Sequence, residues 1–301
     1  MLLSTLFFAA MNVCVKALHR LPTLEIILAR SVISLALTWV AAQRAGVNVW
    51  GGLPPAPGRR RGNRWLLASR GVTGALALIL YFATVQHLPL ALAVTLQYLS
   101  PICTALVGIW LLGEPVRAAQ WACFGVAFGG VLLTQADRAA LPPDAAIWVL
   151  TGIGGAVISG FSYVTIRRLR GQAHPLAIVF WFPLVALPLG VVGTALAGVW
   201  PTPTEWGWLA LTGLFTQGAQ VTMTRAYQAE AVSKVAMLNY IGLFYAVAIG
   251  WGVFDERLAP LTLAGLALVL AGVVANVLVK ARHDRQAAQA RAADALVLDG
   301  A

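Results

Sequence analysis

Charge is scarce in this sequence of 301 residues, and acidic charge is scarcer still. Lys and Arg contribute 21 residues and Asp and Glu only 11, so 11% of the chain is charged while 59% is hydrophobic. A water-soluble domain of this length could not hide so much apolar surface in its core. The mean hydropathy of +0.79 therefore indicates a protein of the lipid bilayer.

Motifs of catalysis and cofactor binding are also missing. No GxxxxGK[ST] phosphate-binding loop occurs, so we do not expect ATP hydrolysis. Cys14, Cys103 and Cys123 lie in apolar segments without CxxC or Cys/His spacing, which predicts no disulfide, no metal site and no cofactor. The histidines and the acidic residues fall outside the centres of the apolar segments. An intramembrane enzyme, which needs titratable partners at mid-membrane, is the disfavoured alternative, and we interpret the chain as no enzyme.

Long apolar runs, in contrast, fill most of the chain. A helix that crosses the ~30 Å hydrocarbon layer needs about 20 mostly apolar residues. The sequence offers ten such segments, which predict an all-α integral membrane protein with ten transmembrane helices, at 2–18, 25–42, 65–86, 91–112, 118–135, 146–166, 175–198, 206–224, 233–254 and 261–279. The first is expected to be retained, because it lacks a charged n-region and carries Lys16.

Basic residues are unevenly distributed among the expected loops. Fifteen Lys and Arg fall in the loops and tail on one side, and three, Arg20, Arg138 and Arg257, fall on the other. The positive-inside rule then places both termini in the cytoplasm, and we expect a multi-pass protein of a bacterial-type cytoplasmic (inner) membrane. The net charge of +10 favours anionic membrane lipids as partners. Nucleic acid is not expected, because the basic residues form no single patch.

The chain contains an internal repeat. An offset of 142 residues places Leu96-Gln97-Tyr98 on Leu238-Asn239-Tyr240, Glu114 on Glu256 and Gly130 on Gly272. An offset of 152 residues relates 20–27 to 172–179. We therefore predict a first five-helix repeat at 1–138, a second at 139–280 and a cytoplasmic tail at 281–301. Because five is odd, the second repeat is inverted, as in many secondary transporters; a duplicated scaffold without transport is the alternative.

Several motifs carry a resemblance over essentially the whole chain. They are "LEIILARS", "LPLALAVTLQYLSPICTALVGIWLLGEPV", "SYVTIRRL" and "AYQAEAVSKVAMLNY", and together they resemble the drug/metabolite transporter superfamily, EamA type. The resemblance implies a secondary transporter that moves a small polar organic solute, such as an amino acid or a related metabolite or drug, by alternating access. It also implies a central cavity lined by the segments at 2–18, 65–86, 91–112, 146–166, 206–224 and 233–254. A passive, channel-like facilitator is the alternative.

The two repeats also differ. Asp255-Glu256-Arg257 stands where the first repeat has Gly113-Glu114-Pro115, and Leu243 matches Pro101. Because proline removes a backbone donor and crowds the preceding turn, we expect a helix bend at Pro101 and none in the matching segment.

Polar side chains within the apolar segments are the candidate solute contacts. The repeat pairs Gln97 and Tyr98 with Asn239 and Tyr240, which makes these four the first choice. Gln217, Gln220 and Thr224 share a helix face by their spacing, and Asn12, Tyr163 and Trp181 complete the candidates. The alternative is that such groups join helices by hydrogen bonds worth about 0.6 to 2 kcal/mol each.

Charged residues near the ends of the expected helices form a second group of candidates. Lys16, Glu25 and Arg30 lie toward the outer side, and Arg225, Glu230 and Lys234 toward the inner side. They are interpreted either as snorkelling side chains or as a charged rim or gate that attracts anionic solutes. Glu25 is close to Arg30 in the sequence, and Arg30 should hold it ionised if the two pair. We expect transport by facilitated diffusion or exchange, with any proton coupling at Glu25. The sequence is compatible with either a monomer or a homodimer.

Overall fold

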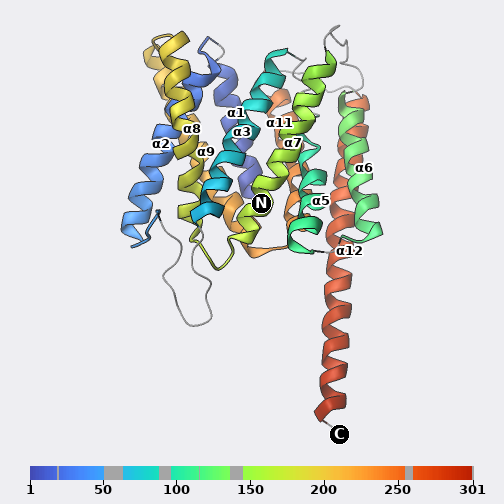
Figure 1. The fold of residues 1–301 in the computed structure, drawn as a ribbon. Helices are drawn as coiled ribbons and strands as arrows, with labels where there is room; N and C mark the ends of the chain where they lie inside the picture. The colour runs from blue at the N-terminus through green and yellow to red at the C-terminus, as the bar shows by residue number, and fades with distance from the viewer. Residues whose placement is uncertain are drawn as a thin grey trace.

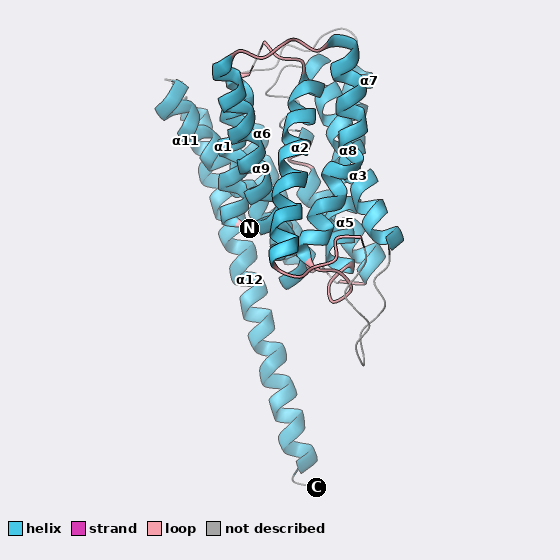
Figure 2. Cartoon of the chain, turned by 90° about the vertical axis from the view of Figure 1, so that its left-hand side faces the viewer, coloured by secondary structure: helices cyan, strands magenta, loops and turns pink. Residues whose placement is uncertain are grey.

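The computed structural model describes residues 1–18, 20–50, 64–87, 96–114, 116–135, 145–254 and 260–299. Within these ranges the chain forms helices joined by short connections and contains no strand. Most of the helices run side by side along one common direction, with the connections gathered at the two ends of the bundle (Figures 1 and 2). The described part of the chain is therefore an all-helical membrane-type fold.

The N-terminal helices are α1 (Leu2–Ala17), α2 (Thr23–Arg44), α3 (Arg64–His87), α5 (Ser100–Leu112) and α6 (Ala118–Gln135). The C-terminal helices are α7 (Ala145–Arg168), α8 (Pro175–Ala197), α9 (Pro203–Ala229), α10 (Val232–Met237), the 3₁₀ turn η2 (Leu238–Tyr240), α11 (Ile241–Phe254) and α12 (Pro260–Asp299). Proline stands in the first turn of α8 and of α9, where its missing N–H would have had no partner in the helix. Gly113 ends α5 with a φ of +65°, a conformation that costs glycine nothing.

Length and hydropathy identify three helices that could cross a bilayer, Thr23–Arg44, Ala146–Arg168 and Pro175–Ala197, and further apolar helices are shorter. The part of the expected span at 91–112 that covers 91–95 lies outside the described residues. The count of ten spans and their inverted arrangement thus stay predictions, whereas the all-helical architecture agrees with the sequence.

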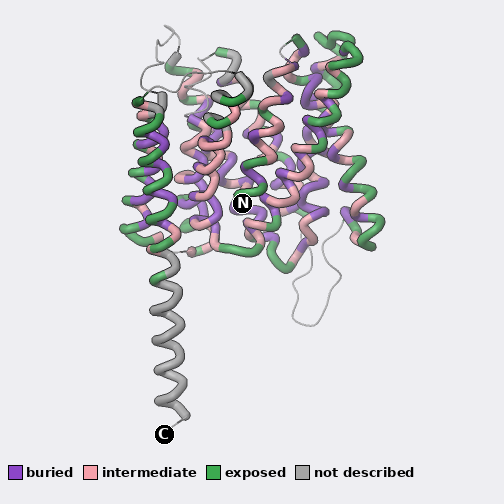
Figure 3. Tube along the Cα trace, turned by 180° about the vertical axis from the view of Figure 1, so that it is seen from behind, coloured by how far each residue is buried: buried purple, intermediate pink, exposed green. Residues whose placement is uncertain are grey.

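The outer surface of the bundle is rich in large apolar side chains. Trp110 and Leu150 on α5 and α7 are 73% and 68% exposed, and Leu196 on α8 is 82% exposed. Buried residues follow the inner faces of the same helices (Figure 3). A surface of this kind is unfavourable in water and suits contact with lipid.

Helix packing joins the N-terminal part of the chain to the C-terminal part. The main contacts pair α6 with α12, α3 with α7, α2 with α8, α1 with α9, α5 with α7, α3 with α8, α2 with α9, α5 with α10, and α1 with α11. Two glycines allow the close approach of α6 to α12. A Cβ placed on Gly130 of α6 would lie 2.6 Å from the carbonyl oxygen of Gly265, and one on Gly272 of α12 would lie 2.8 Å from that of Cys123. Glycine is therefore required at both positions for the α6–α12 crossing.

Candidate functional site

A cavity of about 340 Å³ lies among the helices. Its lining comes from α1, α3, α5, α7, α9, η2 and α11, together with residues 97 and 98 and one residue each of α2 and α8. The expected lining segments all contribute described residues to the cavity. Arg30 of α2 and Phe182 of α8 add two helices that the sequence interpretation did not place at the cavity.

Two chain interruptions border the cavity. Tyr98 and Leu99 form a turn directly before α5, and the 3₁₀ turn η2 separates α10 from α11. Gln97, Tyr98 and Asn239 line the cavity. Tyr240 is fully buried behind Tyr98, with the two ring centroids 5.8 Å apart. The residues that the repeat pairs are thus brought together at one place.

The bend expected at Pro101 takes another form. Pro101 stands in the first turn of α5, a position where proline fits without loss of a helical hydrogen bond, so the helix begins there and does not bend. The expectation that the matching segment would be regular is wrong, because η2 interrupts it at Leu238–Tyr240 without any proline.

The amides of α9 have two different roles. Gln220 lines the cavity and accepts a hydrogen bond of 3.3 Å from Nη2 of Arg70. Gln217 instead accepts a hydrogen bond of 2.6 Å from Ser34 Oγ and donates one of 2.8 Å to Thr38 Oγ1. Both of these partners lie on α2. Thr224 is fully buried and does not line the cavity. Of the three residues expected on one solute-facing side, Gln220 reaches the cavity and Gln217 joins two helices.

The remaining aromatic and amide candidates also divide. Asn12 and Tyr163 line the cavity, and Tyr163 stacks on Tyr227 with centroids 5.1 Å apart. Trp181 donates its indole N–H to the carbonyl oxygen of Val49 at 3.1 Å and is not among the lining residues. Trp181 therefore joins α8 to the segment that follows α2.

Two arginines reach the cavity from the N-terminal helices. Arg30 of α2 is 7% exposed and Arg70 of α3 is 3% exposed, and both line the cavity. Their guanidinium carbons lie 5.4 Å and 5.3 Å from the centroid of the Phe182 ring, which is cation–π distance. Arg30 is thus a cavity residue and not the rim residue that its position in the sequence suggested.

Sequence reasoning missed Arg70 and Phe182 as cavity residues. Arg70 lies within the apolar segment at 65–86, and an ionisable residue inside an apolar segment is itself a signal of function. Phe182 carries no such signal, because one apolar residue in an apolar helix is indistinguishable from its neighbours.

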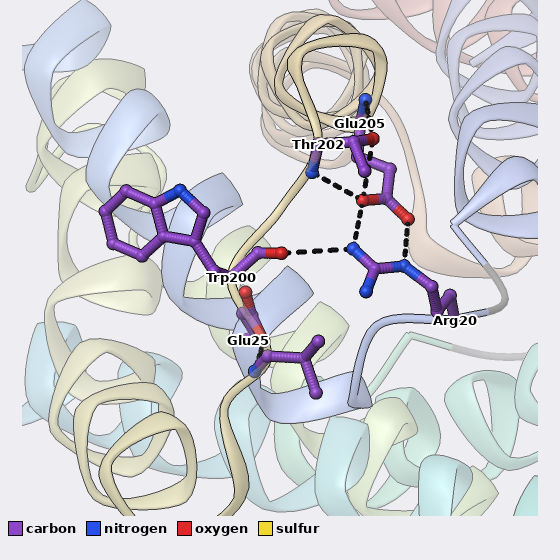
Figure 4. A network of polar contacts seen from close by, with 6 residues as sticks. Arg20, Glu25, Trp200, Thr202 and Glu205 are labelled. Atoms are coloured by element: carbon purple, nitrogen blue, oxygen red, sulfur yellow. Dashed lines mark hydrogen bonds and ion pairs between the residues drawn. The ribbon is translucent and has the colours of Figure 1, made fainter.

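At one end of the bundle, the carboxylates of Glu25 and Glu205 link helix ends by hydrogen bonds (Figure 4). Arg20 donates to both oxygens of Glu205, at 2.9 Å and 2.6 Å, and to the carbonyl oxygen of Trp200 at 3.0 Å. Arg20 is the main reason that the pKa of Glu205 falls to about 2. Glu25 accepts from the backbone N–H of Val199 at 2.9 Å.

Glu25 and Arg30 therefore have different partners, Val199 and Phe182. Residues five apart on a helix do not share a face, unlike those three or four apart, so Glu25 is directed to the helix end and Arg30 to the cavity. On the other side of the bundle Lys234 pairs with Glu230 at 3.1 Å, and Arg225 is exposed on α9. The side chain of Lys16 lies outside the described residues.

A third carboxylate, Glu114, joins helices at the opposite end of the bundle. Glu114, two residues after the end of α5, accepts a hydrogen bond of 3.1 Å from Nε of Arg167 and one of 2.9 Å from the backbone N–H of Val232. Arg167 also donates to the carbonyl oxygen of Gln228 at 3.0 Å. Glu114 thus links α7 to the start of α10. In the described ranges no group of three or more His, Cys, Asp and Glu could hold a metal ion.

Comparison with known proteins gives concordant results. The EamA-like transporter family matches residues 1–135 and, separately, 146–278. A pseudopaline exporter of Pseudomonas aeruginosa is 33% identical over 279 residues, which cover 91% of this chain and 93% of the exporter. A riboflavin transporter of Rhizobium johnstonii is 28% identical and covers 74% of each chain. One crystal structure superposes with a TM-score of 0.80 at 21% identity, covering 93% of this chain and 95% of the other, which supports the same fold.

Proposed function

The chain belongs to the EamA-like transporter family, and from this membership we propose that it moves a small polar organic solute across the bacterial inner membrane by alternating access. The observation that carries the proposal is the cavity at the junction of the two matched halves, which combines apolar walls with polar groups and is bordered by the interruptions at Tyr98–Leu99 and Leu238–Tyr240. Solute sites of many secondary transporters lie at such a junction, next to broken helices.

Helix bounds support two inverted five-helix repeats, at 1–138 and 139–280. The offset of 152 residues places the first residue of α2 on the first residue of α8, and the offset of 142 residues does the same for α6 and α12. The contacts support the same arrangement. Exchanging α1 with α7, α3 with α9, and α5 with α11 converts the α3–α7 contact into α9–α1, and α5–α7 into α11–α1.

The distribution of basic residues supports cytoplasmic termini and contact with anionic lipids. The connections that follow α7 and α9 and the C-terminal part of α12 lie at one end of the bundle (Figure 1), the end that carries Arg168, Arg170 and Lys234. We expect this end to face the cytoplasm.

Single cysteines test that orientation in a background without the three native cysteines. Arg170→Cys should be protected from a membrane-impermeant thiol reagent added to intact cells, and Trp200→Cys should be labelled. Both positions are exposed, so permeabilised cells provide the control in which both should react. Labelling of position 170 but not 200 in intact cells would overturn the orientation.

Solute exchange in proteoliposomes tests the transport mechanism. A carrier should saturate with solute concentration and should show counterflow, whereas a channel-like facilitator should show neither. The absence of any acidic residue from the cavity lining, within the described part of the chain, favours exchange or facilitated diffusion over proton coupling, because a cavity carboxylate is the usual proton carrier. Accumulation that follows an imposed pH gradient, unchanged in Glu25→Gln, would show a proton site elsewhere.

A further inference from the structure

We infer that Arg30 and Arg70 form the binding centre for a carboxylate group of the transported solute. The inference rests on the proposed function, because it names the chemical class of the solute that the cavity takes. Guanidinium groups are the side chains best suited to carboxylates, since their planar fork donates two parallel hydrogen bonds to the two oxygens.

Neither arginine has an acidic partner in the described part of the chain. Arg30 has only the Phe182 ring as a charge-compensating neighbour. Arg70 donates one hydrogen bond, to the neutral Gln220, and its Nε and Nη1 are buried without a partner. Burying a charge without an opposite charge is costly in an apolar environment. An anionic group in the cavity supplies the missing opposite charge.

Local packing favours this arrangement of the two cations. A Cβ on Gly74 would collide with Nη1 of Arg70 and lie 2.7 Å from the Phe182 ring. Glycine at position 74 therefore leaves the space that the Arg70 guanidinium occupies, one turn along α3. Phe182 lies within reach of both guanidinium groups, so one ring holds the two cations at the same wall of the cavity.

Helix ends reinforce the preference for an anion. Ser100, the first residue of α5, and Gly242, the second residue of α11, both line the cavity. The N-terminus of a helix carries partial positive charge, and N-termini of broken helices face anionic substrate groups in other transporters. Arg70 Nε and Nη1, which are buried without a partner in the described part of the chain, remain as donors for the anionic group.

Ligand-dependent thermal stability of the purified full chain tests the inference. The probes are glutamate, succinate, citrate and benzoate, compared with succinamide, benzamide and inorganic phosphate. At least one carboxylate should raise Tm with concentration. Arg30→Gln and Arg70→Gln should each weaken its apparent affinity about ten-fold or more, because each loses a charge-assisted hydrogen bond. Arg168→Gln, which removes an exposed charge at the end of α7, should bind as the wild type does.

Gly74→Ala is the second variant, since it keeps both charges and displaces the Arg70 head group. It should weaken carboxylate binding, while Gly154→Ala, where a Cβ meets open space, should not. Unchanged binding in both Arg variants, stabilisation by succinamide, benzamide or phosphate but by no carboxylate, or no shift with any probe would overturn the inference. Saturable exchange of neutral solutes alone would overturn it and leave the transporter proposal intact. Carboxylate binding without any exchange would support the inference and contradict the transporter proposal.

Discussion

The two halves matched by the transporter family share their architecture and differ in the charge that they bring to the cavity. Residues 1–135 contribute Arg30 and Arg70, whereas residues 146–278 contribute neutral groups, among them Ser162, Gln220 and Asn239. The helix interruptions and the crossing glycines recur in both halves. The two halves thus resemble each other in packing and in helix interruptions, and they differ in the charge that lines the cavity.

Gly130 and Gly272 should be the positions at which the two halves are most nearly equivalent. Loss of the close α6–α12 crossing that they allow should have the largest effect on stability. Gly130→Leu and Gly272→Leu should each lower Tm strongly or prevent folding, because the added side chain meets backbone atoms that cannot move aside. Overpacking of this kind costs about 1–3 kcal/mol or more. Gly125→Leu, on the open side of α6, is the control. A large loss in only one of the two glycine variants would break the equivalence.

The two amides beside the interruptions should have a smaller and mutually similar effect. Gln97→Ala and Asn239→Ala should each weaken solute affinity about three- to ten-fold, the effect of one neutral hydrogen bond, with little change in Tm. Gln217→Ala should show the opposite pattern, a lower Tm with normal affinity, because its side chain joins α9 to α2. Binding titrations and melting curves on the three variants separate the roles. If Gln97→Ala and Asn239→Ala lose stability and affinity together, both amides join helices.

Loss of the ion pair between Arg20 and Glu205 should have the smallest effect on stability, since exposed ion pairs contribute little. The folded-state pKa of Glu205 is depressed to about 2 from 4.5 by Arg20, so its stabilising contribution is present above pH 4.5 and is lost as the pH falls toward 2. Wild type should therefore lose Tm more steeply than Glu205→Gln over that interval, and the two should run parallel between pH 6 and 8. Equal slopes in acid would show that the Arg20 pair does not stabilise the fold.

Sequence patterns predicted the helices well because apolar length and prolines are local signals. The expected spans 118–135 and 175–198 coincide with α6 and α8 to within one residue. The cavity was harder to predict, because the direction of a side chain depends on the rotation of its helix about its own axis. That rotation sends Gln220 to the cavity and Gln217, three residues earlier, to α2. It likewise sends Arg30 inward and Glu25 to the helix end.

The contact between Arg30 and Phe182 has a consequence for the origin of the chain. The 152-residue offset that aligns α2 with α8 places these two residues at equivalent positions, and they touch each other. In a symmetric dimer of identical half-length chains, equivalent positions carry the same residue, so this contact would join two arginines or two phenylalanines. A cation that faces an aromatic ring is available at this contact only when the two positions can differ in sequence. A substitution at either position then changes the partner that the other one meets.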